Sequence, residues 1–176
     1  NLILTMNAGF IAAESWVQDL KIGGGRIIGE ACHFIDLAVF LTGSLVDSIC
    51  FNALGKNPQE NTDNGSLLLK HDNGSLSTIN YVSNGAKSYS KERVEVFSQN
   101  RTWTVDNFRV TRGYNIKGFK KLKTRLDKGH RAQFEAYLNY IKSGGEALIP
   151  LNQLINVSRA SLAAIESLKT KAWVNI

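Results

Sequence analysis

Short apolar runs separated by turn sequences dominate the middle of the chain. The turn Asp72-Asn73-Gly74 joins two alternating runs and predicts a hairpin, so consecutive strands should be antiparallel. The runs have the length of strands rather than of helices. The predicted strands cover residues 2–8, 46–53, 66–71, 75–82, 93–98, 101–105, 108–112 and 172–176.

Three longer segments predict helices. Residues 30–41 have helical length and stop before Gly43, residues 131–142 stop before Gly144, and residues 152–169 repeat apolar positions near a 3.6 period. One helix, a meander of strands and two further helices predict an α+β domain. Its open, mostly antiparallel sheet should have the helices packed on one face. A doubly wound dinucleotide-binding fold is excluded, since it needs alternating strands and helices with a GxGxxG turn after the first strand.

Length and composition indicate one globular domain covering residues 1–176. Of these residues 43% are apolar and 20% are charged, which suffices for a full core. Because the chain starts at Asn1 within an apolar run, we expect it to be a fragment of a longer protein. With neither a secretory leader nor about 20 consecutive apolar residues, it is expected to be cytoplasmic, without a membrane partner. Cys32 and Cys50 lack metal-site spacing and are expected to be buried thiols.

The net charge of +6 is uneven along the sequence. A solvated loop is one explanation of the basic run at residues 117–128, and contact with the phosphates of a nucleic acid, a cofactor or a nucleotide sugar is the other. Only Phe119 interrupts its lysines, whereas nucleic-acid readers usually add interleaved aromatics, so no nucleic-acid partner is expected. The run consists of Lys117, Lys120, Lys121, Lys123, Arg125 and Lys128.

The first predicted helix contains the residues most suited to catalysis or ligand binding. Between Ala31 and Leu41 every residue is apolar except His33 and Asp36. A helix that is apolar nearly all round is buried, so these two side chains need partners. They either form a structural pair that joins the helix to the sheet, or they line a polar pocket in which a histidine transfers a proton near neutral pH.

A motif around this helix resembles a known family. The run at residues 23–36, GGGRIIGEACHFID, is similar to the signature of the Gfo/Idh/MocA oxidoreductases, in which a triple glycine precedes a helix bearing Asp-x-x-x-His-x-x-Asp. With NAGFI at residues 7–11 and Trp16, it most resembles members fused behind an alcohol-dehydrogenase-like domain. Residues 91–96, 127–130 and 141–150 also resemble that subgroup, so the similarity covers nearly the whole chain.

The resemblance implies a function for the chain. It would be the carboxy-terminal substrate-binding and dimerisation domain that follows an N-terminal Rossmann domain absent here. The full-length protein would use NAD or NADP to oxidise a secondary alcohol of a sugar, nucleotide sugar or polyol. No cofactor is expected on the fragment alone, which should be inactive.

The resemblance also assigns residue roles. His33 would be the acid or base that works with a lysine of the missing domain. The family's aspartate four positions earlier is replaced by Gly29, and Glu30 is a candidate substitute although one position rotates a helical side chain by about 100°. Asp36 would orient the helix or the imidazole, or form only a structural hydrogen bond.

The resemblance implies that the polar residues of the opening segment lie where the family's pocket receives a sugar or polyol. Asn7 and Gln18 offer hydrogen bonds to hydroxyls, and Trp16 either stacks on a sugar ring or fills the core. The remaining histidines have ordinary explanations: His130 as a helix cap or surface residue, and His71 as a solvated hairpin residue.

Two further functions compete with the oxidoreductase hypothesis. The domain could be a non-catalytic binding module that forms a homo-oligomer through the open face of its sheet, and alternating apolar positions on that face would favour this. Metal-assisted hydrolysis through His33 and Asp36 is disfavoured, because the chain has three histidines and none shows zinc-ligand spacing.

Overall fold

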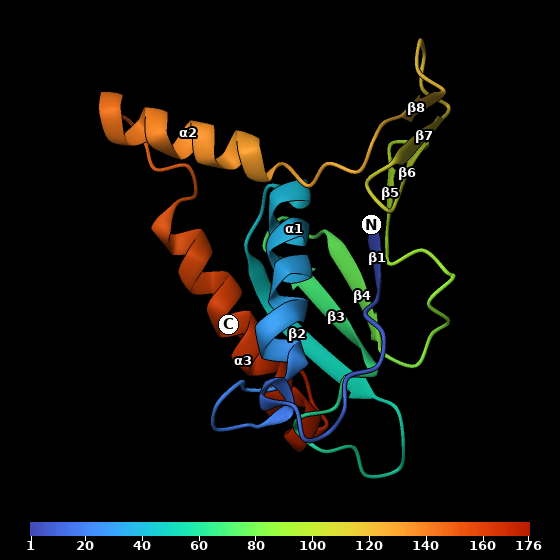
Figure 1. Cartoon of the computed structure of the whole chain (residues 1–176), viewed down its shortest axis with the longest axis vertical. Coiled ribbons are helices and arrows are strands. Elements are labelled where there is room, and N and C mark those ends of the chain that lie inside the picture. The colour runs from blue at the N-terminus through green and yellow to red at the C-terminus, as the bar shows by residue number, and fades with distance from the viewer.

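A computed structural model describes all 176 residues as one nine-stranded sheet with three α-helices (Figure 1). The strands are β1 (Leu2–Asn7), β2 (Val46–Ala53), β3 (Gly65–His71), β4 (Leu76–Val82), β5 (Glu92–Ser98), β6 (Arg101–Asp106), β7 (Val110–Tyr114), β8 (Lys121–Lys123) and β9 (Val174–Asn175). The helices are the 3₁₀ turn η1 (Trp16–Gln18), the π turn η2 (Ile27–Ala31), α1 (Cys32–Thr42), α2 (His130–Ser143) and α3 (Leu151–Thr170).

The sheet is open and mostly antiparallel. Its strand order is β8-β7-β6-β5-β1-β4-β3-β2-β9, and the only parallel pair is β1 with β4. The hairpin predicted at Asp72-Asn73-Gly74 joins β3 to β4. The α+β class with an open antiparallel sheet is confirmed.

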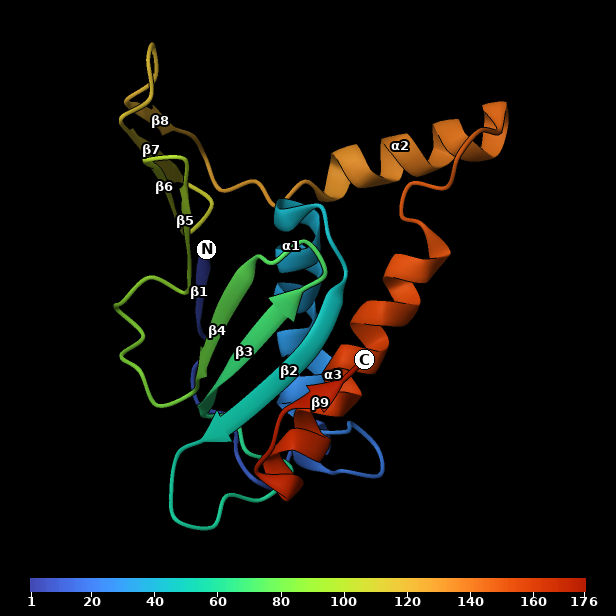
Figure 2. The ribbon, with the colours of Figure 1, turned by 180° about the vertical axis from the view of Figure 1, so that it is seen from behind.

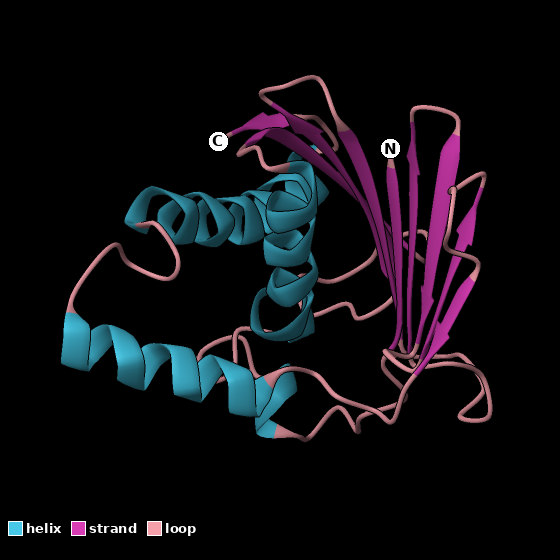
Figure 3. Cartoon of the chain, turned by 90° about the horizontal axis from the view of Figure 1, so that it is seen from above, coloured by secondary structure: helices cyan, strands magenta, loops and turns pink.

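Helices α1 and α3 pack over the half of the sheet made by β1 to β4 (Figures 2 and 3). Every second residue of these strands points toward the helices. Leu4, Ile79 and Leu67 thus form one fully buried row across three strands. Ala160 and Ala164 of α3 are also fully buried, and their small side chains let α3 approach its neighbours closely. None of the helices combines the length and apolar content that a membrane span requires.

Helix α2 differs from the other two. It lies on the same side of the sheet but extends away from the body, and none of its residues is buried (Figures 1 and 3). The residues Phe134, Tyr137, Leu138 and Ile141 form an exposed apolar stripe with i, i+3, i+4, i+7 spacing. The stop before Gly144 correctly predicted the helix, but it could not show whether this chain supplies a surface that covers its apolar stripe.

Three local predictions needed correction. The first helix begins with the π turn η2 at Ile27, three residues before Glu30, and part of the basic run forms the edge strand β8 instead of a loop. Cys32 and Cys50 were expected to be buried thiols, but both are only partly buried.

The prediction that His71 is a solvated histidine is wrong. It is 3% exposed, because it occupies the last position of β3 on the face that the helices cover. Its Nε2 lies 2.8 Å from Ser77 Oγ, and its Nδ1 lies 3.2 Å from the Ser44 carbonyl oxygen. Burial lowers the pKa of His71, so the neutral imidazole is the form that the fold stabilises.

The buried imidazole should make stability depend on pH. The folded pKa of His71 lies below the unfolded value of about 6.5, so its contribution is present above that pH and is lost as the pH falls through the folded pKa. The free energy of unfolding should therefore decrease from pH 7 toward pH 5.5, with a slope of up to about 1.4 kcal/mol per pH unit. Urea unfolding at several pH values measures this slope. His71→Gln should flatten it, whereas His130→Gln at an exposed position should not; an equal slope in both variants would contradict the assignment.

Candidate functional site

A groove of about 750 Å³ runs along α1. One wall is α1 itself. The other walls combine segments far apart in sequence: the start of β5, the turn before β7, the segment between β8 and α2, the first turn of α2, and the start of α3 with the two residues 148–149 before it. The polar residues that line the groove are Glu30, His33, Asp36, Lys91, Glu92, Asp127, Lys128, His130, Gln133 and Gln153.

The structure brings His33 and Asp36 together in this groove. They lie one turn apart on α1, where His33 is exposed and Asp36 is half-buried. No hydrogen bond joins the two side chains or ties either to the sheet, so they do not form the structural pair considered as an alternative. The expectation of a helix buried all round fails for the same reason, since Phe40 on this helix is also exposed.

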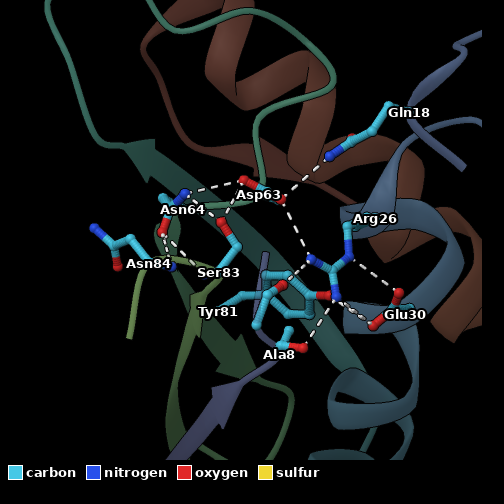
Figure 4. Close-up of polar contacts among 10 residues, drawn as sticks. Ala8, Gln18, Arg26, Glu30, Asp63, Asn64, Tyr81, Ser83 and Asn84 are labelled. Atoms are coloured by element: carbon cyan, nitrogen blue, oxygen red, sulfur yellow. Dashed lines mark hydrogen bonds and ion pairs between the residues drawn. The ribbon is translucent and has the colours of Figure 1, made fainter. Parts of the chain in front are cut away.

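Glu30 faces the groove but is held in a polar network (Figure 4). Arg26 donates to both of its oxygens, from Nε at 3.0 Å and from Nη2 at 3.2 Å, and the Tyr81 hydroxyl donates to Oε2 at 2.7 Å. Burial opposes ionisation of Glu30, but these donors outweigh it and hold the pKa of Glu30 below its usual value. For Tyr81, burial and the bond to Glu30 raise the phenol pKa far above its usual value.

Arg26 is the centre of that network and is 2% exposed. Besides Glu30, its guanidinium donates to the carbonyl oxygen of Gly9 at 2.7 Å and to Asp63 Oδ2 at 3.3 Å. Asp63 Oδ1 in turn accepts a hydrogen bond from the Ser83 hydroxyl at 2.8 Å. The network therefore connects the end of β1, the start of α1, the segment before β3 and the end of β4.

The triple glycine brings Arg26 into this position. Gly24 and Gly25 have φ values of +71° and +81°, which side chains rarely adopt. A Cβ on Gly23 would lie 2.5 Å from the Trp16 carbonyl oxygen, so only glycine fits against the η1 turn. The three glycines thus let the chain turn tightly before Arg26 and the helix.

The three substrate-binding candidates of the opening segment do not line the groove. Gln18 is buried and donates to Asp63 Oδ2 at 3.2 Å, as part of the Arg26 network. Asn7 is buried and donates to the carbonyl oxygen of Ala86 at 2.8 Å, with Gly85 packed against its amide oxygen. Trp16 is 65% exposed. None of these three candidates for substrate binding lines the groove beside His33, and their role stays a prediction.

The sequence did not predict the residues that form the groove wall opposite His33. Glu92 is a buried carboxylate, with its side chain 8% exposed, and it pairs with Lys128 Nζ at 2.6 Å. That ammonium also lies 5.8 Å from the centre of the Phe108 ring. The available signal was the alternation of β5, in which Glu92 shares the inward-facing phase of Val94, a position where a charged residue is unexpected.

The lining of the groove suits a ligand with several hydroxyl groups, and His33 could exchange a proton with such a ligand. The exposed imidazole of His33 can accept or donate a proton, and the carboxylates of Asp36, Glu92 and Asp127 can accept hydrogen bonds from hydroxyls. No group of three or more His, Cys, Asp or Glu side chains is arranged to hold a metal ion, so the structure gives metal-assisted hydrolysis no support.

Removing the central cation should destabilise the fold strongly. Arg26→Met leaves the carboxylates of Glu30 and Asp63 without their partner, and we expect a loss of about 3–5 kcal/mol in the free energy of unfolding. Tyr81→Phe removes one hydrogen bond to a carboxylate and should cost about 1–3 kcal/mol. Denaturant unfolding measures both losses.

The exposed pair of Lys169 with Glu60 is the matched control. Lys169→Met should change stability by less than about 1 kcal/mol, because solvent screens an exposed ion pair. A loss of that small size for Arg26→Met would show that the network does not hold the fold.

Comparison with known proteins gives one family match. Residues 5–104 match the family model described as the GFO/IDH/MocA C-terminal domain. A search of curated protein sequences finds no match.

Solved structures share the fold at low sequence identity. The UDP-N-acetylglucosamine 3-dehydrogenase from Acidithiobacillus ferrooxidans has a TM-score of 0.74 and 18% identity, over 96% of this chain and 53% of that one. An oxidoreductase domain protein from Kribbella flavida has a TM-score of 0.82 and 17% identity, over 99% and 57%. The aldose-aldose oxidoreductase from Caulobacter crescentus, in complex with glycerol, has a TM-score of 0.78 and 12% identity, over 99% and 55%. The chain thus spans little more than half the length of these relatives.

Proposed function

The chain belongs to the Gfo/Idh/MocA family as its C-terminal domain, and on this basis we propose that it supplies the substrate groove and an acid-base histidine to an NAD(P)-dependent oxidoreductase. The substrate would be a sugar, nucleotide sugar or polyol with a secondary alcohol. The observation that carries the proposal is the place of His33: it is exposed and unpaired on α1, in a groove that it shares with the unpaired carboxylate of Asp36 and with Asp127 and Glu92. Names of the structural relatives, which include a UDP-sugar dehydrogenase and an aldose oxidoreductase, support the substrate class.

His33 would take the proton of the reacting hydroxyl as the alcohol becomes a ketone, and return it in the reverse direction. When bound, NAD or NADP supplies the hydride acceptor. Asp36 would orient the imidazole or a substrate hydroxyl. Glu92 and Lys128 would bind the opposite side of the substrate. Glu30 is assigned a positioning role, because a carboxylate that already accepts three hydrogen bonds is poorly placed to exchange protons.

The cofactor would be held by another domain. This chain has no GxGxxG turn between a strand and a helix, but it presents His33 on an open surface that a nucleotide-binding domain can face. The exposed apolar stripe of α2 gives such a domain a surface to pack against. We propose that the Rossmann domain contacts α2 and closes the groove.

Self-association is the second candidate function, and it is compatible with the first. The face of the sheet opposite the helices is uncovered (Figure 2), and Leu68, Leu76 and Phe97 on it are substantially exposed. A homodimer through this face would need to bury more than about 1,000 Å² in total.

Replacing His33 tests the catalytic role. In the full-length enzyme, His33→Asn should lower turnover by roughly 10² to 10⁴ while leaving the melting temperature and cofactor affinity little changed. His71→Gln, a change to a core histidine, is the control: it should lower the melting temperature and spare turnover. Steady-state kinetics and thermal melts measure both. Unchanged turnover in His33→Asn would sink the acid-base assignment.

A charge on the open sheet face tests self-association. Thr78 lies on the central strand β4, paired with Leu68 of β3, and Thr78→Arg would place a cation in the middle of the interface. Light scattering at high micromolar concentration should show a dimer for the parent chain and a monomer for Thr78→Arg. Lys142→Gln on α2 should remain dimeric. A parent chain that is monomeric would count against this interface.

A further inference from the structure

The net charge of the protein resides in one short segment. Residues 99–123 contain seven Lys and Arg against a single Asp, which equals the net charge of +6 of the whole chain, while the remaining residues contain fourteen of each sign. This segment forms β6, β7 and β8 with their turns, and it projects from the body at the far edge of the sheet (Figure 1). The basic character found in the sequence is therefore a local property of this extension.

Four of these cations line a hollow of about 870 Å³, and no acidic residue lines it. Its polar wall includes neutral hydrogen-bonding groups from two turns, Asn100 and Asn115, and the half-exposed phenol of Tyr114. The cations that line it are Arg101, Arg112, Lys117 and Lys120.

The hollow is shaped by fixed contacts. Phe119 packs on Trp103 with the ring centres 5.0 Å apart, and it lies over Gly113, where a Cβ would come within 2.8 Å of that ring. Asn115 donates to the carbonyl oxygen of Asn100 at 2.8 Å and so ties the two turns together. The loop from residue 115 to residue 120 is thereby folded back over the strands.

None of the four cations has an anionic partner in the chain. The six ion pairs of the structure all lie elsewhere. Four like charges around one hollow repel one another, and an anion bound between them removes that repulsion. Guanidinium groups favour phosphate oxygens because two parallel N–H donors match them.

We propose that this hollow binds the phosphate group of a small soluble ligand through Arg101 and Arg112, with Lys117 and Lys120 adding charge. The site is separate from the groove of His33: Glu92 lines the groove and Ser98 ends the same strand next to the hollow, about 20 Å away at 3.3 Å per residue. The proposal therefore stands independently of the oxidoreductase assignment, and its ligand need not be the substrate.

Pyrophosphate titration followed by NMR tests the site. At low salt we expect saturable 1:1 binding, with amide shifts confined to residues 99–101 and 112–120, and weaker binding at 0.5 M salt because screening is stronger. The double variant R101Q/R112Q should weaken binding at least tenfold. The control K142Q/R159Q removes two exposed, unpaired cations elsewhere and should bind as the parent does.

Three outcomes would overturn the proposal. One is non-saturable binding with shifts spread over all surface lysines. Another is an equal loss of affinity in both double variants, which would indicate only a response to net charge. The last is tight binding of a single-stranded oligonucleotide by a chain that does not bind pyrophosphate. A failure of any of these kinds would leave the kinetic test of His33 unaffected.

Discussion

The buried guanidinium of Arg26 is the constraint on which the arrangement of the site depends. A cation that is 2% exposed must be neutralised and hydrogen-bonded, and its partners come from four separate segments. They are the carbonyl oxygens just after β1, Glu30 in the π turn η2, Asp63 before β3 and, through Asp63, Ser83 after β4. Because its position depends on the glycine turn before it, the triple glycine and the arginine act as one structural unit. In this chain, the run from Gly23 to Arg26 therefore serves to hold the fold together.

That fixed start determines what the next turns of α1 present. Arg26 and Tyr81 hold Glu30 and so fix the orientation of the helix about its own axis. His33, about one turn later, therefore projects into the groove. The distinction between the two residues is one of environment. Glu30 has lost its freedom to exchange protons because its oxygens are already engaged, whereas His33 has no partner within the chain and is open to one from outside. Glu30 is thus fixed by its partners in the chain, while the neighbouring imidazole of His33 remains open to a ligand.

Features that depend on local patterns were predictable from the sequence, and features that depend on distant partners were not. Alternation and turn residues predicted the strands and the hairpin at Asp72-Asn73-Gly74. The stop before Gly144 predicted α2, and the apolar period predicted α3, both within a residue or two. The exposure of α2, the burial of His71 and the pairing of Glu92 with Lys128 each depend on which segments meet in space. Among the site predictions, His33 and Asp36 do face one groove. Asn7 and Gln18 were proposed because the family resemblance implies a substrate pocket at the opening segment, but the fold engages both side chains elsewhere.

The groove beside His33 and the hollow lined by Arg101 and Arg112 differ in charge, and this difference affects which ligands each can bind. In the groove, the carboxylates of Asp36, Glu92 and Asp127 face the ammonium groups of Lys91 and Lys128, and Glu30 is neutralised by Arg26. Such a mixed lining offers both acceptors and donors, which suits a neutral ligand with several hydroxyls more than an anion. The hollow lined by residues 99–101 and 112–120 offers cations, neutral amides and the phenol of Tyr114, and no acidic residue. If one ligand had to occupy both, its anionic and hydroxylated parts would need to span about 20 Å, the length of β5. The separation therefore favours two ligands with opposite requirements, a hydroxylated one at His33 and a phosphorylated one at the edge of the sheet.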